Sequence, residues 1–481
     1  MWSSELFFVY PEVVLTTFAS FILLLDLWLS PKSKWIIYTL SQLALMATMY
    51  CLIQLIAFTP TIVFNGAIIL DSISLSLKLI ICLFGSFVFI YTRKYLFDRQ
   101  EFKAEYFILC LFSILGMMIL VSSYNFLSLY LGIELLALPL YALITMLQGN
   151  KLATEAAMKY FIMGALASGM LLYGISLLYG VTGSLSLIAV AEHLSISSAA
   201  PSLTLMFGLI FVFVSLAFKF GAVPFHMWLP DVYQGSPIIM TLFIGTLPKL
   251  AAFGFAIRML NDTFPSLHFH WQPLLITMGI LSLIIGNVVA IAQSNLKRML
   301  AYSTIAHMGF LFLGLSLGSE AGFIAAYNYI LIYALMALGG FGVMTLLSCE
   351  SIEAENIQDF QGLSSQHPWF AFLMMLILLS LAGIPPFSGF YAKFFIIKEL
   401  IDSGYLGLAL FAVLMTVIGA YYYLRIIRVM FFDAPQGSKI QTSLASPEAI
   451  VLTLNGFLLL ILGIFPAALY QFCQVLVLTA F

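Results

Sequence analysis

Apolar runs about the length of a membrane span recur along this chain almost without pause. A transmembrane helix needs roughly 20 apolar residues, and we place about fourteen such runs. Because 63% of the 481 residues are hydrophobic and only 8% are charged, a water-soluble globule is excluded. The sequence therefore predicts an all-α polytopic membrane protein. The approximate limits of the spans are 8–29, 35–58, 68–92, 105–122, 124–148, 156–180, 202–222, 236–261, 272–292, 300–317, 322–347, 369–397, 404–427 and 449–474.

The distribution of lysine and arginine predicts how the chain lies in the membrane. Of 19 basic residues, five fall within spans and two, Arg258 and Lys398, fall in the loops of one side. By the positive-inside rule the other loops are cytoplasmic, which places both termini outside. The basic residues of those cytoplasmic loops are Lys32, Lys34, Arg93, Lys94, Arg99, Lys103, Lys151, Lys297, Arg298, Arg425, Arg428 and Lys439.

The sequence offers no motif for binding a redox group or a nucleotide. It contains no Walker loop, no GxGxxG after a strand and no HExxH, and its cysteines form no CxxC pair. We therefore expect any redox chemistry to belong to another polypeptide and the cysteines to serve packing. These are Cys51, Cys82, Cys110, Cys349 and Cys473.

Two segments of the form Gly-x-x-Pro-Phe, 221–225 and 383–387, predict interrupted helices in spans 7 and 12. Proline removes a backbone hydrogen bond, and such a gap survives in a membrane only where protein or water satisfies the freed groups. Interrupted helices at matching places are typical of inverted-repeat transporters, although two short motifs can also coincide by chance. The division that follows is 1–104 for helices 1–3, 105–265 and 266–435 for two repeats of about five helices, and 436–481 for the last helix.

Five ionisable side chains inside the predicted spans, apart from Lys78, stand out as candidates for function. A charge at the centre of a bilayer costs roughly 2.5–3.5 kcal/mol on insertion scales, so these residues predict a charge pathway across the membrane. Two of them allow a simpler interpretation. Lys159 lies about one turn into its span and could extend to the interface, whereas Glu134 could make a structural hydrogen bond or pair with a lysine such as Lys159. The other three are Lys219, Lys249 and Lys393.

Lys219 and Lys249 each lie beside a helix-breaking residue, Gly221 and Pro248 respectively. Burial disfavours the charged form of a lysine, and a nearby carboxylate favours it. Movement of Glu134 toward or away from a lysine would therefore load or release a proton. Lys393 follows the second break and is the corresponding candidate in the other half.

His226 and His307 are candidate proton relays, because an imidazole titrates near physiological pH, but hydrogen-bonded packing groups are an equal alternative. Lys78 has no evident partner and is interpreted as structural. A cluster of acidic residues in a predicted cytoplasmic loop favours a solvated face or a subunit contact. This cluster is Glu350, Glu353, Glu355 and Asp359.

Two long motifs resemble a known family. Residues 218–231, with the sequence FKFGAVPFHMWLPD, and 295–309, with the sequence NLKRMLAYSTIAHMG, are similar to the antiporter-like subunits of the proton-translocating NADH:quinone oxidoreductase, respiratory complex I. Segments 232–237 and 248–253, together with the lysine at 393, are similar to one of the subunit types within this family. The resemblance extends over nearly the whole chain.

The resemblance implies roles for the buried residues. It implies that Glu134 and Lys219 form a modulating pair, that Lys249 is the central site, and that Lys393 is the terminal site facing the outside. Lys159 matches a further family lysine, and His226 and His307 fall within family motifs as secondary relays.

The resemblance also implies proton transfer from the cytoplasm to the outside of a bacterial plasma membrane, driven by quinone reduction. NADH, FMN, iron–sulfur clusters and quinone would be bound by partner subunits, namely other membrane subunits and a peripheral redox arm. Two alternatives remain open: a subunit of a multi-subunit sodium/proton antiporter, and a structural spacer of the membrane arm.

Overall fold

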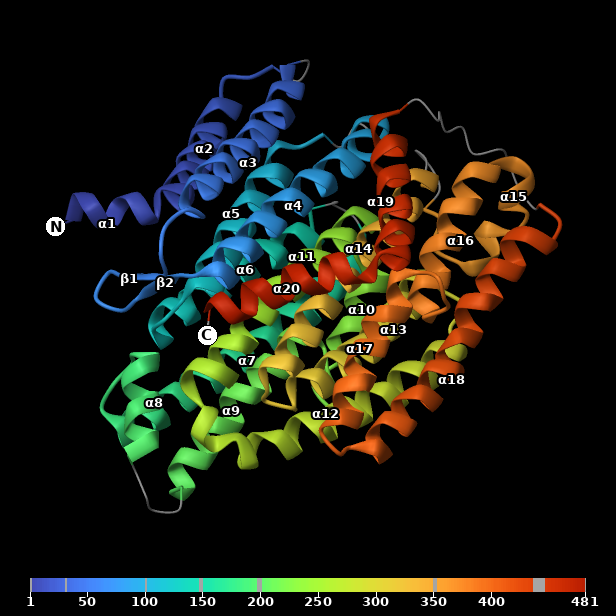
Figure 1. The fold of residues 1–481 in the computed structure, drawn as a ribbon. Helices are drawn as coiled ribbons and strands as arrows, with labels where there is room; N and C mark the ends of the chain where they lie inside the picture. Colours follow the sequence, from blue (N-terminus) through green and yellow to red (C-terminus); the bar gives the residue numbers. More distant parts are fainter. Residues whose placement is uncertain are drawn as a thin grey trace.

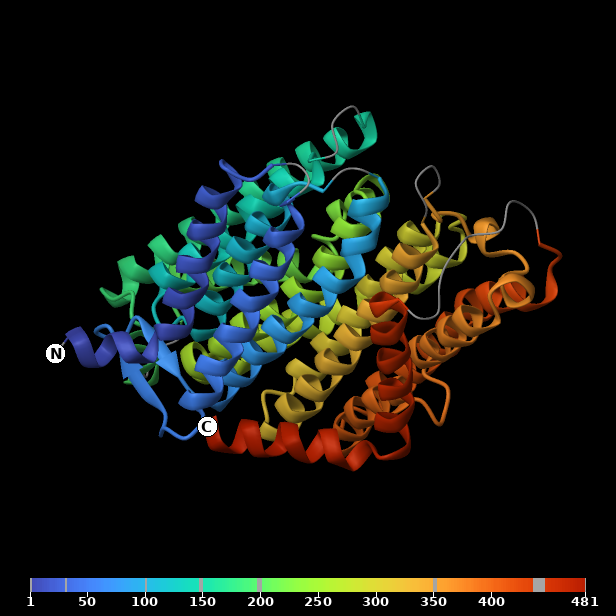
Figure 2. The ribbon, with the colours of Figure 1, turned by 90° about the horizontal axis from the view of Figure 1, so that it is seen from above.

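The computed structural model is a bundle of long helices (Figures 1 and 2). It describes residues 2–30, 33–99, 102–146, 150–196, 201–348, 353–435 and 446–480. Within these ranges, 11 helices are long and apolar enough to cross a membrane. The chain is therefore a multi-pass membrane protein, while the count of about fourteen spans and the two repeats stay predictions.

The structural elements follow one another in this order. The first half contains α1 (Trp2–Phe8), α2 (Tyr10–Asp26), α3 (Trp35–Leu55), β1 (Thr61–Val63), β2 (Ile68–Leu70), α4 (Ser72–Asp98), α5 (Ala104–Ser122), α6 (Phe126–Ile144), α7 (Lys151–Thr182), α8 (Leu187–Ile196), α9 (Leu203–Phe220), α10 (Trp228–Gly235), α11 (Ile238–Ile257) and η2 (Arg258–Thr263). The second half contains η3 (Pro265–Leu267), α12 (His268–Ile291), α13 (Leu296–Leu315), α14 (Glu320–Leu347), η4 (Ile357–Phe360), α15 (Leu363–Gln366), α16 (Pro368–Ala382), α17 (Ser388–Asp402), α18 (Leu406–Phe432), α19 (Pro447–Ile464) and α20 (Pro466–Ala480).

Several helices begin where a short polar side chain can cap them. Such a side chain satisfies one of the first backbone N–H groups, which have no partner inside the helix. Cap bonds of this kind start α6, α7, α9, α13 and α14. The capping residues are Asn125, Asn150, Ser202, Asn295 and Ser319.

Two helices, α11 and α14, form the centre of the bundle. Every residue of α11 is buried, as is every residue of α14 from Gly322 onward. The two helices pack against each other, and α14 also contacts α13 and α17. A helix that is apolar all round belongs in the interior, so polar side chains on these helices are enclosed by protein. Helices such as α3, α7 and α18 are less than half buried and would face lipid.

The chain is interrupted at both predicted segments. Gly221 directly follows α9 and Gly383 directly follows α16, and these two glycines have left-handed φ angles of 70° and 81° respectively. Glycine adopts this conformation without steric cost, so each helix ends at the first residue of its Gly-x-x-Pro-Phe motif. The chain then continues as α10 and α17. The Val223–Pro224 and Pro385–Pro386 peptide bonds are cis.

The last predicted span, 449–474, differs from the structure. Helix α19 ends at Ile464, and α20 begins at Pro466 and crosses the bundle at a steep angle to α19 (Figures 1 and 2). Proline fits the first turn of a helix and ends the preceding one, so a single apolar run forms two helices. The hairpin β1–β2 and helix α8 were also not predicted.

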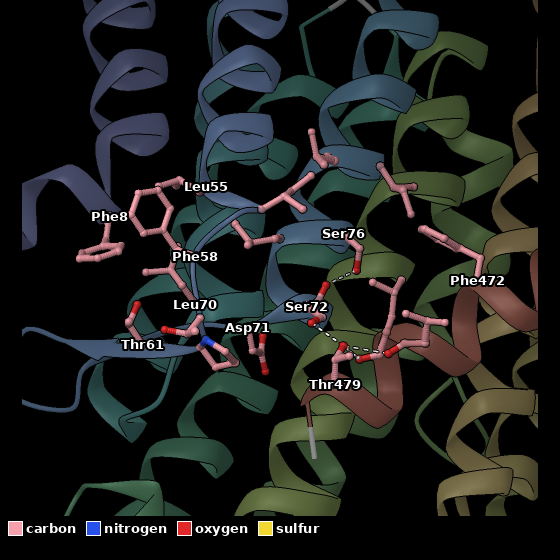
Figure 3. Close-up of a pocket in the computed structure, with 18 residues that line it drawn as sticks. Phe8, Leu55, Phe58, Thr61, Leu70, Asp71, Ser72, Ser76, Phe472 and Thr479 are labelled. Carbon is pink, nitrogen blue, oxygen red and sulfur yellow. Dashed lines mark hydrogen bonds between the residues drawn. The ribbon is translucent and has the colours of Figure 1, made fainter.

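A pocket of about 480 Å³ lies between the two ends of the chain (Figure 3). Phe8 and Leu55 line it from the N-terminal side and Phe472 from α20, while the Thr479 hydroxyl donates a hydrogen bond of 2.7 Å to Ser72 at its edge. None of the predicted site residues lines this pocket. Its one ionisable lining residue, Asp71, is held by a buried arginine, so we place the candidate site elsewhere.

Candidate functional site

Lys249 lies in the central helix α11 and is bound to the end of α9. Its ammonium group donates hydrogen bonds of 2.9 Å and 2.8 Å to the carbonyls of Lys219 and Phe220. The last carbonyls of a helix have no intrahelical partner and carry a partial negative charge. The end of α9 therefore supplies acceptors for a lysine that has no exposed surface. The Nζ atom also lies 5.2 Å from the Trp228 ring centroid.

Lys393 has the same arrangement at the second interruption. From α17 it donates hydrogen bonds of 3.0 Å and 3.1 Å to the carbonyls of Leu381 and Ala382, the last residues of α16. Its side chain passes directly over Gly383, where a Cβ atom would lie 3.1 Å from Nζ. Each interrupted helix thus ends against a buried lysine, supplied by α11 in one case and by α17 in the other.

Glu134 and Lys219 are close to each other but are not bound. Glu134 comes from the middle of α6 and is half-buried, and Lys219 comes from the last turn of α9. The carboxylate is near enough to act on the lysine electrostatically. Within the described residues, however, neither Glu134 Oε1 nor Lys219 Nζ has a hydrogen-bond partner, and no ion pair joins them. A buried charge without a partner is energetically costly. This pair is therefore suited to a change of protonation state.

A small cavity connects Lys219 with Lys249. Leu136, Tyr160 and Trp228 complete part of its wall, and its volume is about 10 Å³. Roughly this much space accepts one water molecule when polar partners are present. A single bridging water could therefore carry a proton between the two lysines.

His307 lies in a network of hydroxyl groups on α13, α14 and α18. Its Nδ1 atom is 2.7 Å from the Tyr329 hydroxyl, and its Nε2 atom is 3.2 Å from the Tyr423 hydroxyl. Ser303 also bonds to Tyr423, and Lys393 is near enough to His307 to act on it electrostatically. The imidazole is 3% exposed, so these partners replace solvent. Such a chain of donors and acceptors can pass a proton toward Lys393.

Lys159 lies at the surface instead of inside the bundle. It is exposed and forms ion pairs of 2.9 Å with Glu155 and 2.8 Å with Asp231. The suggested pairing of Lys159 with Glu134 is therefore wrong, and the extension to the interface is the interpretation that fits. Arg298 also binds Asp231, at 2.7 Å. Burial alone would raise the pKa of Asp231, but hydrogen bonds from the two cations outweigh burial and lower that pKa.

His226 is half-buried in the segment that joins α9 to α10. Its Nδ1 atom is shielded from solvent and has no hydrogen-bond partner among the described residues. The neighbouring Trp228 is fixed, since its indole N–H donates to the Phe218 carbonyl at 3.0 Å. The structure therefore does not connect His226 to the His307 network.

Lys78 has a partner that the sequence did not reveal. Its Nζ atom lies 2.6 Å from Glu12 Oε1 in α2, at an angle outside hydrogen-bond geometry, and the lysine has no exposed surface. Arg258 is likewise not a loop residue. It is 1% exposed and binds Asp71 at 2.8 Å and Asp262 at 3.0 Å. Both are buried ion pairs that join distant helices.

The acidic loop is tied to the bundle instead of forming a solvated face. Glu355 binds the buried ammonium group of Lys297, Glu353 lies 3.6 Å from the same group, and Glu353 also binds Arg99 at 3.3 Å. Lys297 in turn donates to the Ser236 carbonyl at 2.8 Å. These contacts join the ends of α4, α10 and α13 that the predicted orientation places on the cytoplasmic side. Four residues that carry a prediction from the sequence, Lys32, Cys349, Glu350 and Lys439, lie outside the described residues.

Sequence reasoning did not find the tyrosine hydroxyls around His307 or the role of Asp231 in holding Lys159. A signal existed for the tyrosines, because Tyr329 and Tyr333 are four residues apart and so share one face of an apolar helix. Among the described residues, no group of three or more His, Cys, Asp or Glu side chains could hold a metal ion. The arrangement is suited to proton transfer between side chains.

Comparison with known proteins shows the family to which the chain belongs. Residues 123–419 match the family model described as NADH:quinone oxidoreductase/Mrp antiporter, TM. NADH-quinone oxidoreductase subunit N of Thioalkalivibrio sulfidiphilus is 49% identical over 96% of this chain and 96% of its own length. The chain belongs to the NADH-quinone oxidoreductase subunit N family. The expected family of antiporter-like complex I subunits is thereby confirmed.

Two solved structures share the fold of this chain. A chain of respiratory complex I from Thermus thermophilus matches with a TM-score of 0.82 and 30% identity, over 96% of this chain and 98% of that one. A chain of the Mrp complex from Dietzia sp. matches with a TM-score of 0.84 at 19% identity, over 100% of this chain and 98% of that one, which shows a shared fold. The polytopic helical fold class is confirmed with them.

Proposed function

We propose that this chain carries protons from the cytoplasm to the outside as a membrane subunit of NADH:quinone oxidoreductase. The observation that supports this most is the pair of buried lysines, Lys249 and Lys393, each bound to the carbonyl end of an interrupted helix. Such a site stabilises an ammonium group without a counter-ion. The lysine can therefore gain or lose a proton as the end of the helix moves.

The proposed transfer begins at Glu134 and Lys219 and ends at Lys393. When Glu134 approaches Lys219, the ammonium form is favoured, and when it withdraws, Lys219 releases its proton toward Lys249. Lys249 is the central site, and His307 relays the proton to Lys393, which faces the outside. Moving one proton across the whole membrane potential costs roughly 2.3 kcal/mol per 100 mV, so the proton affinities of the sites must change by at least this amount in total.

The remaining predicted residues have lesser roles in the proposal. Lys159 lies at the cytoplasmic end, where its ion pairs with Asp231 and Glu155 surround a surface pocket of about 190 Å³ that can admit water. We assign it to proton entry. His226 stays a secondary relay at the interruption after α9.

We further propose that the redox work is done by partner subunits. NADH, FMN, iron–sulfur clusters and quinone would be bound there, and other membrane subunits would connect this chain to the peripheral redox arm. The membrane is the bacterial plasma membrane, with both termini outside. This chain then converts conformational change into proton movement.

The proposal is tested by proton pumping and NADH:quinone activity in membranes that carry Lys219→Ala. Because a positioned proton-transfer group contributes on the order of a hundredfold or more to rate, we expect pumping per assembled complex to fall by about that factor. Lys151→Ala is the matched control, since Lys151 is an exposed lysine at the start of α7. It should assemble and pump normally.

The same experiment separates the alternatives. If fully assembled Lys219→Ala pumps normally, the proton path through this residue fails and the structural spacer is favoured. If the purified chain comes without a peripheral redox arm and exchanges sodium for protons, the sodium/proton antiporter is favoured. We retain this second alternative because the chain shares its fold with a chain of the Mrp complex.

A further inference from the structure

We propose that the hydroxyl group of Tyr233 relays protons between the Lys249 site and the His307 network. This inference rests on the proposed function, because it needs a proton to move along the centre of the bundle. The described hydrogen bonds leave a gap at this point: Lys249 is bound to the end of α9, and His307 is bound to α14 and α18. Tyr233 lies between the two.

Tyr233 belongs to α10, a short helix in the middle of the bundle that packs against α7, α11 and α13 (Figure 1). The residue has no exposed surface. Its ring lies 5.7 Å from that of Phe341 on α14, and its hydroxyl is 3.3 Å from the position that a Cβ atom on Gly245 of α11 would take. A larger residue at 245 would displace the hydroxyl.

The Tyr233 hydroxyl has no hydrogen-bond partner within 3.5 Å among the described residues. A buried polar group without a partner is destabilising, and phenylalanine would avoid that cost. Packing alone therefore gives no reason for the oxygen atom. A hydroxyl that must exchange partners during a transfer does give one, because it cannot be bound permanently to a single neighbour.

Hydroxyl groups on the second half of the bundle surround Tyr233 on one side. The Thr304 hydroxyl lies near the Tyr233 hydroxyl but outside hydrogen-bond geometry, and Tyr333 acts on Tyr233 electrostatically. Tyr333 donates to Thr304 at 2.9 Å. Thr304 is three residues before His307 on α13, so the two share a helix face, and the Tyr333 ring lies 5.5 Å from the imidazole.

On its other side, Tyr233 approaches the Lys249 site through Tyr160. Tyr160 acts electrostatically on Tyr233 and stacks on Trp228 with a centroid distance of 4.6 Å. Tyr160 also lines the small cavity that it shares with Lys219 and Lys249. Tyr233 is thus flanked by the wall of the first lysine site and by the hydroxyls next to His307.

The transfer step balances without any further reactant. The Tyr233 oxygen accepts a proton that originates from the Lys249 ammonium group, and its own proton passes to the Thr304 or Tyr333 oxygen. At Lys249 one N–H bond breaks, and at Tyr233 one O–H bond forms and one breaks. The receiving hydroxyl passes its own proton to the His307 imidazole, where an N–H bond forms, so every hydroxyl group stays neutral before and after the step. Rotation about the C–O bond restores the starting orientation.

The test compares Tyr233→Phe with Tyr91→Phe in the assembled complex in membranes. Tyr91 is a matched control, since it is 1% exposed and its hydroxyl has no hydrogen-bond partner within 3.5 Å. It packs from α4 on Gly342 of α14, the helix that Tyr233 also contacts. We expect Tyr233→Phe to lower pumping per assembled complex by about a hundredfold, and Tyr91→Phe to leave it unchanged. Normal pumping by assembled Tyr233→Phe would overturn the inference.

Two further arms make the result decisive. Lys249→Ala is measured in parallel: if it abolishes pumping while Tyr233→Phe does not, the relay fails and the proposed function stands, whereas normal pumping in both defeats both. Fluorotyrosine placed at position 233 keeps the ring packing but makes the phenol more acidic. It should shift the pH profile of pumping, which fluorotyrosine at 91 should not do, and an unchanged profile also counts against the relay. If Tyr233→Phe does not assemble, the fluorotyrosine experiment alone tests the relay.

Discussion

At the residue scale, the ion pair of Glu12 and Lys78 gives a direct test of how a buried charge is held in this bundle. Removing one partner leaves the other charge buried, which costs about 3–5 kcal/mol. We expect Lys78→Met to lower thermal stability and the amount of assembled complex. The double variant Glu12→Gln/Lys78→Met should recover most of both losses, because neither side chain then carries a charge.

A thermal unfolding assay on the single and double variants measures the coupling between the two residues. Lys151→Met serves as the control for losing a lysine at an exposed position. If the stability lost in the double variant equals the sum of the losses in the two single variants, the two residues are not energetically coupled. The same reasoning makes Lys78 unsuitable as an inert control for proton transport.

Single residues were predictable where they break an apolar run, and their partners were not. Lys249 and Lys393 stand out because a charge within a membrane span is rare. Their acceptors are backbone carbonyls, whose availability depends on where α9 and α16 end in space. The sequence also does not identify Glu12 as the partner of Lys78, because the two residues meet only where α2 lies near α4.

At the element scale, Gly383 allows a test of the second interruption. Its φ of 81° costs another residue about 1–2 kcal/mol. A Cβ atom at this position would lie 3.0 Å from Cδ and 3.1 Å from Nζ of Lys393. We therefore expect Gly383→Ala to destabilise the chain by about 1–2 kcal/mol and also to lower pumping, since Lys393 is pushed away from the end of α16.

Gly407→Ala is the matched control for Gly383→Ala. Gly407 has ordinary backbone angles, and nothing lies within 4 Å of the position of its Cβ atom. Thermal unfolding and proton pumping are measured for both variants. Equal stability and equal pumping in the two would show that the end of α16 does not hold Lys393 in its working position.

The interruptions of α9 and α16 were predictable because glycine and proline act locally on the backbone. The turn between α19 and α20 was not predicted, although Pro466 marks it, because the apolar run continues through that residue and a proline is compatible with a kinked span. The hairpin β1–β2 was missed because its two strands have only three residues each. Such short strands carry almost no periodic signal.

At the scale of the whole molecule, the basic residues predict the orientation, and the proposed direction of proton transfer depends on that orientation. The structure strengthens the asymmetry, because Arg258 is sequestered by Asp71 and Asp262 and no longer counts as a loop charge. Thr479 is exposed and lies next to Ser72, at the start of α4. Lys151 is exposed at the start of α7. The preceding helix, α6, begins near the hairpin β1–β2, so its other end and Lys151 lie away from the hairpin. The two positions should lie on opposite sides of the membrane.

Thr479→Cys should react with a membrane-impermeant maleimide in intact cells, and Lys151→Cys should react only in inverted vesicles. The unmodified complex gives the background from the native thiols, of which Cys82, Cys110 and Cys473 are buried. Opposite labelling would reverse the orientation derived from the charges. Lys393, the proposed terminal site, would then face the cytoplasm, and the proposed path could deliver protons outward only if its order were reversed.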